Sequence, residues 1–156
     1  MLGSNIEPRL SFLQKAENAL EVSLGKIFQM SLVYESEPWG FQASQTFLNR
    51  VVIVETDLSA RAVLKAVLSI ENEMGRERLN TGYASRQIDI DILYFNEMKI
   101  EEPGLIVPHP GIPDRRFVLL PLVEVAEGFV HPVLKQTNKD LLSACTDQLR
   151  VWVYKA

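Results

Sequence analysis

The sequence has little of several features that would point to a particular class of protein. It contains one cysteine, Cys145, so it can form neither an internal disulfide nor a zinc site made of cysteines. A lone thiol suits a reducing compartment, and we expect the cytoplasm. No apolar run is long enough to span a membrane and no signal peptide is recognisable, so we expect no membrane partner.

An excess of positive charge is also missing. The 16 lysines and arginines are outnumbered by 20 aspartates and glutamates, which gives a net charge of −4. Because nucleic-acid-binding domains are usually basic, we expect no nucleic-acid partner. Repeats and low-complexity segments are lacking too, and 156 residues with 47% hydrophobic content are typical of one globular domain, taken here as residues 1–156.

Hydrophobic spacing predicts helices and strands along this domain. A turn is expected at Gly3-Ser4-Asn5, with only Met1 and Leu2 ahead of it. Helices are expected from Pro8 to Gly25, from a cap at Asp57 or Ser59 to Ile70, over 117–125, and over 140–144 behind a Thr137 cap. Strands are expected over 28–34, 48–55, 88–95 and 149–154, with a short hairpin partner at 98–100.

The core order is therefore strand, helix, strand, strand, helix, strand. This order is typical of the ferredoxin-like βαββαβ arrangement. The predicted fold class is α+β: an antiparallel sheet with helices on one face, extended by C-terminal additions. The first strand is central in such a sheet.

The most informative segment is the predicted strand that contains Asp89 and Asp91. Isoleucines alternate with these aspartates at 88, 90 and 92, so the two carboxylates are expected on one strand face, with Cα atoms roughly 6.6 Å apart. Paired carboxylates are costly without a cation between them, and oxygen ligands suit Mg²⁺. The simpler alternative is a solvated strand face, although aspartate is a poor strand former.

Basic residues precede this strand. Arg76, Arg78 and Arg86 bracket a polar loop, and Arg86 leads directly into the aspartates. Arginine suits a phosphate, and a loop of this kind can close over an anion, so these residues favour phosphoryl-type chemistry. The alternative is an ordinary solvated surface loop.

Aromatic and amide side chains suggest a second kind of ligand. Trp39, Phe47 and Phe117 offer ring faces, and Asn49 offers a donor and an acceptor in one plane. Together they suit a flat heteroaromatic molecule, although an aromatic taken alone is more often a core residue, with Trp39, in a loop between proline and glycine, as the exception. His109, held between two prolines and close to Arg115, is either structural or a phosphate contact.

Seven motifs in this order resemble one family, 6-hydroxymethyl-7,8-dihydropterin pyrophosphokinase of folate biosynthesis. The resemblance runs from Gly3 to about Val125, and the last thirty residues contribute little to it. The motifs are Gly3-Ser4-Asn5, Glu37-Pro38-Trp39-Gly40, Phe47-Leu48-Asn49, Gly75-Arg76-Glu77-Arg78, Arg86-x-x-Asp89-x-Asp91-Ile92-Leu93, Val107-Pro108-His109-Pro110 and Arg115-Arg116-Phe117.

The resemblance implies a transfer of diphosphate from ATP to the hydroxymethyl group of the pterin, with release of AMP. It assigns two Mg²⁺ ions to Asp89 and Asp91 and catalytic roles to these residues together with Arg76 and Arg86. It assigns nucleotide contacts to Glu71, Arg78, His109 and Arg115, and pterin contacts to Ser36, Trp39, Phe47, Asn49 and Phe117. Phe47, Tyr83, Ser85 and Pro110 differ from residues common in the family.

Two alternatives remain open at this point. One is another two-metal enzyme on the same fold, such as a nucleotidyl transferase or nuclease. The other is a non-catalytic ferredoxin-like module that binds a small regulatory ligand. The expected partners are the small molecules ATP and 6-hydroxymethyl-7,8-dihydropterin, and the expected assembly is a monomer or weak dimer.

Overall fold

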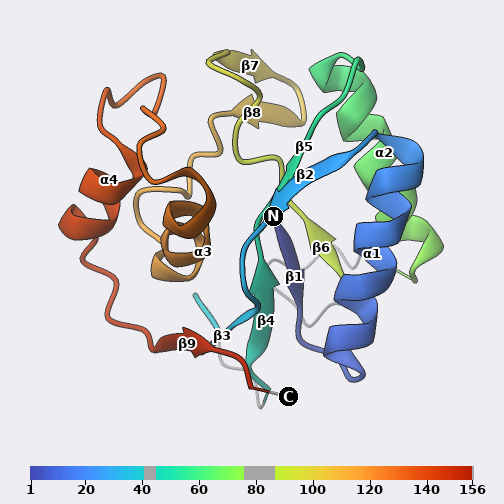
Figure 1. Ribbon diagram of the computed structural model, residues 1–156, viewed down its shortest axis with the longest axis horizontal. Coiled ribbons are helices and arrows are strands. Elements are labelled where there is room, and N and C mark those ends of the chain that lie inside the picture. The colour runs from blue at the N-terminus through green and yellow to red at the C-terminus, as the bar shows by residue number, and fades with distance from the viewer. Residues whose placement is uncertain (41–44, 76–86, 156) are drawn as a thin grey trace.

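A five-stranded antiparallel sheet forms the centre of the computed structural model, which describes residues 1–40, 45–75 and 87–155. The strand order is β6-β1-β4-β3-β9 (Figure 1). Its members are β1 (Leu2–Ser4), β3 (Tyr34–Ser36), β4 (Phe47–Arg50), β6 (Asp89–Ile90) and β9 (Val151–Val153). The first four strands have the predicted ferredoxin-like order, and β9 adds an edge strand beside β3.

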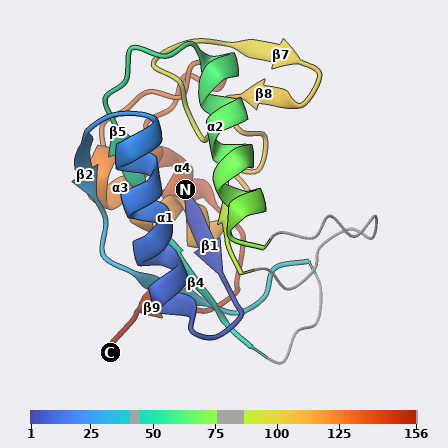
Figure 2. The same cartoon turned by 90° about the vertical axis from the view of Figure 1, so that its right-hand side faces the viewer.

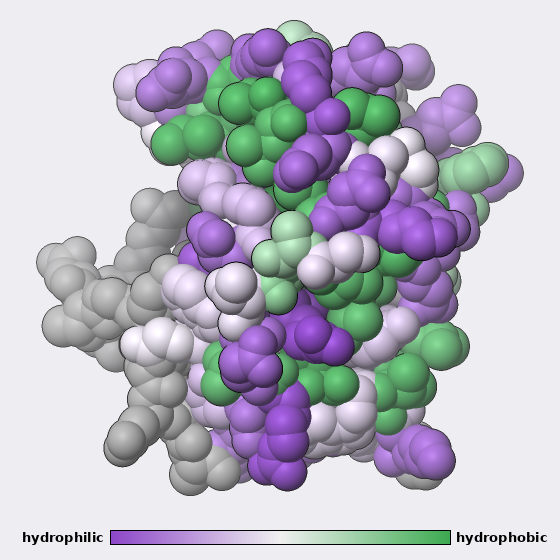
Figure 3. Space-filling view, turned by 90° about the vertical axis from the view of Figure 1, so that its left-hand side faces the viewer, coloured by the Kyte–Doolittle hydropathy of each residue, from purple (hydrophilic) through white to green (hydrophobic). Residues whose placement is uncertain are grey.

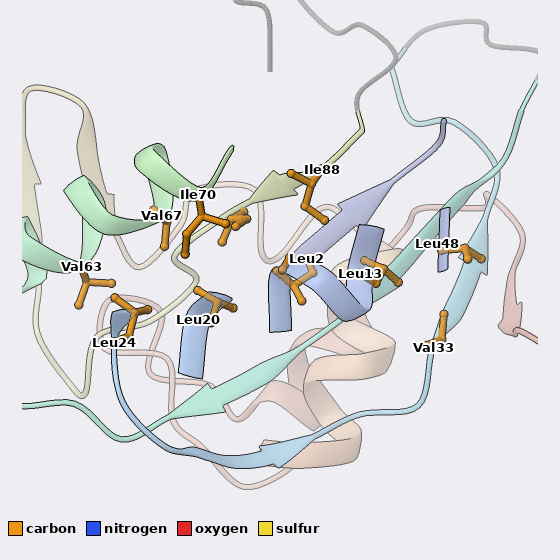
Figure 4. Close-up of a cluster of buried hydrophobic side chains, with 12 residues drawn as sticks. Leu2, Leu13, Leu20, Leu24, Val33, Leu48, Val63, Val67, Ile70 and Ile88 are labelled. Carbon is orange, nitrogen blue, oxygen red and sulfur yellow. The ribbon is translucent and has the colours of Figure 1, made fainter. Parts of the chain in front are cut away.

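Two helices cover one face of this sheet (Figure 2). They are α1 (Arg9–Ser23) and α2 (Ala60–Glu73), and the Ser59 side chain caps α2 by accepting the Ala62 N–H. Their apolar sides meet the sheet in a continuous core. Figure 4 shows this core, which includes Leu2, Leu13, Leu20, Leu48, Val63, Val67, Ile70 and Ile88.

The opposite face is covered as well, which the sequence did not predict. Helices α3 (Arg116–Ala126) and α4 (Asn138–Ala144) pack on each other, and α3 contacts β3 and β4. They form a second core with the sheet, made of Val51, Leu93, Ile112, Val118, Leu119, Leu122 and Leu141. The predicted fold class is confirmed, with the two helices of the ferredoxin-like core on one face; what the sequence did not predict is that the C-terminal additions supply a third layer.

The predicted turn at Gly3 and Ser4 is also wrong, because both residues belong to the central strand. β1 pairs with β4 on one side, with Gly3 opposite Asn49, and with β6 on the other, with Gly3 opposite Asp89. The Ser4 hydroxyl donates to the Gln87 carbonyl at 2.6 Å. Ladder pairing on both sides outweighs the local turn preference of a Gly-Ser-Asn sequence.

Two of the predicted strands are each divided in two. β2 (Ile27–Met30) is separate from β3, and β5 (Val52–Val54) is separate from β4; β2 and β5 pair in a small sheet of their own. The break is fixed at Ser31, whose hydroxyl accepts the Val51 N–H at 3.1 Å and whose own N–H donates to the Val51 carbonyl. A side-chain bond here replaces regular ladder pairing.

The aspartate strand is shorter than predicted, and the hairpin lies elsewhere. Only Asp89 and Ile90 join the sheet as β6, because β1 offers so few partner residues; Asp91 still exchanges two main-chain bonds with Met1. The hairpin is formed by β7 (Ile100–Glu102) and β8 (Leu105–Val107) rather than by 98–100. None of the helices described is long and apolar enough to cross a membrane.

A buried histidine organises the loop between α3 and α4. The ring of His131 is 5% exposed, and its Nδ1 accepts the N–H groups of Val133 and Leu134 at 3.2 and 3.1 Å. The Tyr94 ring meets it edge-on at 5.6 Å, and the Tyr94 hydroxyl donates to Asn138 at 2.8 Å. Since an accepting Nδ1 carries no proton, the folded state favours the neutral ring.

This geometry predicts a pH-dependent stability. Burial lowers the pKa of His131 below its ordinary value of 6.5, so below that pH the unfolded chain binds a proton that the folded chain resists. The contribution is complete above the ordinary pKa and is lost as the pH falls through the folded pKa. We expect the free energy of unfolding in urea to fall from about pH 7 to about pH 5 by more in the native chain than in His131→Asn, whose amide oxygen accepts without titrating. Equal losses in both would contradict this role.

Candidate functional site

An aromatic pocket opens beside the central strand. It has a volume of about 80 Å³, and its lining includes Asp89 and Asp91 together with Met1 and Gly3. Its walls come from the end of β3, the start of β4 and the start of α3. The wall residues are Ser36, Glu37, Trp39, Phe47, Asn49, Arg115 and Phe117. Five predicted pterin contacts therefore meet in one pocket, although they come from segments far apart in the sequence.

Asn49 is held in a fixed orientation at this pocket. It is 1% exposed, and its Nδ2 donates to the hydroxyl of Ser36 at 2.9 Å. Because that donor is anchored, the plane of the amide is set by the protein before any ligand arrives. Ser36, itself 2% exposed, therefore orients the amide, a role that the sequence alone did not indicate.

Trp39 and Arg115 meet across the pocket. The guanidinium carbon of Arg115 lies 4.5 Å from the centre of the Trp39 ring, within the range of a cation–π interaction. Trp39 follows β3 and Arg115 precedes α3, so this contact links two walls that belong to different layers. The rings of Trp39 and Phe117 thus belong to the two walls that this contact joins.

The two aspartates are the acidic part of the site. Ile88 and Ile90 are buried at 1% and 8% exposure, whereas Asp89 and Asp91 are partly exposed, so the predicted alternation of the strand is confirmed. Burial raises the pKa of Asp91, and the neighbouring charge of Asp89 raises it further. The charged form of Asp91 is therefore destabilised, which favours the binding of a cation beside it.

A second pocket shares the same aspartates and extends to α2 and β8. It has a volume of about 360 Å³ and is lined, besides Asp89 and Asp91, by Glu71, His109, Pro110 and apolar residues of both elements. Nε2 of His109 lies 4.0 Å from a carboxylate oxygen of Asp91. Its Nδ1 accepts the Gly111 N–H at 3.0 Å, which fixes the ring, and burial lowers the pKa of His109.

Glu71 has a role in the fold that the sequence did not indicate. It is 1% exposed, and its carboxylate accepts the Ile90 N–H at 2.9 Å. This N–H points away from β1, so Glu71 covers the outer edge of β6 and holds the aspartates in place. Glu71 also lines the second pocket, where the resemblance assigns it a nucleotide contact.

The structure thus gathers the predicted residues into two adjoining pockets. Arg76, Arg78 and Arg86, and the departures at Tyr83 and Ser85, fall within 76–86, outside the described residues. Met1, Gly3 and Glu37 line the aromatic pocket without having been predicted as site residues. Gly3 and Glu37 each belong to one of the seven family motifs, and membership in a motif was the signal that could have indicated them.

Comparison with known proteins decides the family. The family model described as 7,8-dihydro-6-hydroxymethylpterin-pyrophosphokinase matches residues 1–127. The chain belongs to this family. The predicted resemblance is confirmed, and with it the class of reaction: an ATP-dependent transfer of pyrophosphate to hydroxymethyldihydropterin in folate biosynthesis. The non-catalytic alternative is thereby excluded.

Curated relatives agree with this family over most of their length. The 2-amino-4-hydroxy-6-hydroxymethyldihydropteridine pyrophosphokinase of Porphyromonas gingivalis is 40% identical over 140 residues, which cover 88% of this chain and 95% of the relative. The enzyme of the same name from Bacillus subtilis is 39% identical over 158 residues, covering 99% of this chain and 89% of the relative.

Solved structures of longer chains share the fold. A Plasmodium falciparum HPPK-DHPS triple mutant superposes with a TM-score of 0.76 at 19% identity, and another HPPK-DHPS, in complex with substrates, with 0.74 at 15%. Each alignment covers 92% of this chain but only 42% of the longer one. At this identity the likeness supports the predicted ferredoxin-like fold alone.

The donor set fits magnesium. Among the described residues no cluster of three or more acidic, histidine or cysteine side chains could hold a metal by itself, which leaves the Asp89–Asp91 pair. Mg²⁺ is commonly held by one or two carboxylates while substrate phosphates and water fill the other positions. Two adjacent carboxylates, one with a pKa raised by burial and by the other's charge, are a suitable partial set.

Asn49 provides a test of the aromatic pocket. We expect Asn49→Ala to weaken binding of the hydroxymethyl dihydropterin by about 1–3 kcal/mol, because polar groups on the ligand edge would lose their partner. Nucleotide affinity should change little. Isothermal titration of both ligands measures the two affinities.

Asn138→Ala is the matched control, since Asn138 is equally buried but bonds to Tyr94 and Ala126 away from the pocket. It should lower stability and leave pterin affinity unchanged. Loss of nucleotide affinity with unchanged pterin affinity in Asn49→Ala would reverse the assignment.

Proposed function

We propose that this pyrophosphokinase performs its transfer across the Asp89–Asp91 segment, with the pterin in the aromatic pocket and the nucleotide in the second pocket. The attack of the pterin hydroxyl falls on the β-phosphorus of ATP, and AMP leaves. The observation that carries this proposal is that both aspartates line both pockets. A group bound on each side would meet its partner at the carboxylates.

The residues of the aromatic pocket would bind and orient the acceptor. Asn49, fixed by Ser36, would recognise the edge of the pterin, and the rings of Trp39, Phe47 and Phe117 would contact its faces. The Arg115–Trp39 contact would yield to the ligand, which frees the guanidinium for a phosphate. Fixed orientation is a large part of what such a reaction requires.

The second pocket would bind the phosphates and the adenosine. His109, held through its Nδ1, presents Nε2 toward Asp91 and toward the phosphates. The aspartates would hold two Mg²⁺ ions, which supply charge neutralisation when bound. Glu71 would contact the nucleotide and keep β6 in place, and Arg76, Arg78 and Arg86 would add positive charge by the assignment from their motifs.

The assembly, compartment and partners of the protein are proposed from its sequence. We propose a monomer or weak dimer in the cytoplasm, one domain over residues 1–156, and no nucleic-acid or membrane partner. The lone Cys145 supports the proposed compartment, and the net charge of −4 supports the absence of a nucleic-acid partner.

The test of the proposed function is AMP release. AMP should appear from ATP and Mg²⁺ only when 6-hydroxymethyl-7,8-dihydropterin is present, and it should match the pterin diphosphate one to one. Release of AMP without the pterin, or ADP as the product, would contradict the proposal.

Substitution of the aspartates tests their proposed role between the two pockets. We expect Asp89→Asn and Asp91→Asn each to lower turnover by about 100-fold or more, since loss of a metal ligand costs several kcal/mol of transition-state stabilisation. The melting temperature should stay close to that of the native chain. Asp57→Asn, at an exposed aspartate before α2, is the control and should leave turnover unchanged. Near-normal turnover of either site variant at ordinary Mg²⁺ would disprove the metal assignment.

A further inference from the structure

The C-terminal tail beyond α4 contacts two walls of the aromatic pocket. The family match ends at residue 127, so this tail lies outside it. In the ribbon the tail runs from α4 along the edge of the molecule to β9 (Figure 1). Four of its residues, Asp147 to Arg150, lie between the start of α3 and the end of β3, and we call this segment the strap.

At one end the strap holds the wall that carries Trp39. The guanidinium of Arg150 donates from Nε and Nη2 to one carboxylate oxygen of Glu37, at 2.9 and 2.7 Å. The Arg150 N–H donates to the other oxygen at 3.0 Å, and the Glu37 N–H donates back to the Arg150 carbonyl at 3.2 Å. Four bonds thus join Arg150 to a residue that lines the pocket.

At its other end the strap holds the wall that carries Arg115 and Phe117. A carboxylate oxygen of Asp147 accepts the Arg116 N–H at 2.9 Å, in the first turn of α3. The residue at the N-cap position, Arg115, makes no capping bond with its own side chain. Asp147 therefore acts as a remote cap, and its charge is favourable at a helix N-terminus. Its second oxygen accepts the Leu149 N–H at 3.0 Å, which fixes the carboxylate.

We propose that the strap sets the spacing between the two aromatic walls, with Arg150 and Asp147 as positioning residues for the pterin. The inference rests on the proposed function of the aromatic pocket. It explains why Glu37, a pocket residue, is paired with the tail although Arg150 is 78% exposed. Exposed ion pairs contribute little stability, so the effect of this pair is expected in ligand geometry rather than in folding.

The face that carries the strap also offers a control ion pair. It lies on the side that Figure 1 shows at the left, and this face carries hydrophilic side chains interspersed with apolar ones (Figure 3). Another exposed ion pair near the tail, Lys139 with Glu127, joins α4 to the end of α3 and touches neither wall. It offers a matched control for the loss of a surface charge.

The experiment compares Arg150→Ala, Arg150→Lys and the control Lys139→Ala by titration with the hydroxymethyl dihydropterin and with ATP. We expect Arg150→Ala to weaken pterin binding about fivefold or more while ATP affinity and melting temperature stay near native values. The pterin affinity of Arg150→Lys should lie between those of the native chain and Arg150→Ala, because lysine keeps the charge but not the two-donor geometry. Glu37→Ala combined with Arg150→Ala should be no worse than Glu37→Ala alone, because loss of the Glu37 carboxylate already removes both bonds that the Arg150 guanidinium makes.

A spectroscopic readout separates positioning from general destabilisation. In a Trp152→Phe background Trp39 is the single tryptophan, and Arg150→Ala should shift its emission whereas Lys139→Ala should not. Unchanged pterin affinity in Arg150→Ala, or equal loss of pterin and ATP affinity, would contradict the proposal that the strap positions the pterin. Failure of the unmodified chain to bind the pterin would instead overturn the proposed function, so the two failures are distinguishable.

Discussion

The pairing of β1 with β6 is the constraint on which the site depends. β1 is only three residues long, yet it holds β4 on one side and β6 on the other, and so places Gly3 between Asn49 and Asp89. Through these two registers the amide of the aromatic pocket and the first aspartate become neighbours. Glu71 completes the arrangement by bonding the outer edge of β6 at Ile90.

The two aspartates owe their position to this pairing and to the alternation of the strand. Ile88 and Ile90 are drawn into the core below α2, and the carboxylates are left at the boundary between two pockets. Burial and then the charge of Asp89 raise the pKa of Asp91, although His109, Arg115 and the N-terminal amine offset part of this shift. The same placement that destabilises the charged Asp91 carboxylate in the fold thus favours the binding of a cation there.

Much of this could be predicted from the sequence because the signals were local. Alternating isoleucine and aspartate indicated the strand face, and the motifs around Trp39, Asn49 and His109 indicated the ligands. The division of the long strands at Ser31 could not be predicted, since it depends on a side-chain bond to Val51 across the sheet. The layer formed by α3 and α4 was missed because amphipathic spacing does not tell which face of a sheet a helix covers.

The contacts that orient the pocket residues could not be predicted from the sequence for a similar reason. Ser36 anchors Asn49, and Arg150 holds Glu37 over a separation of 113 residues. A serine at a strand end and an arginine in a tail carry no pattern of their own, so only the folded chain reveals their partners.

Anomalous diffraction from crystals grown with Mn²⁺, a non-hydrolysable ATP analogue and 6-hydroxymethyl-7,8-dihydropterin would locate the metal and both ligands. We expect metal density within about 2.2 Å of carboxylate oxygens of both Asp89 and Asp91, a typical length for a bond from such an ion to oxygen. We also expect the pterin beside Asn49 and the nucleotide beside His109. Metal bound away from these aspartates, or both ligands on one side of them, would contradict the proposed arrangement.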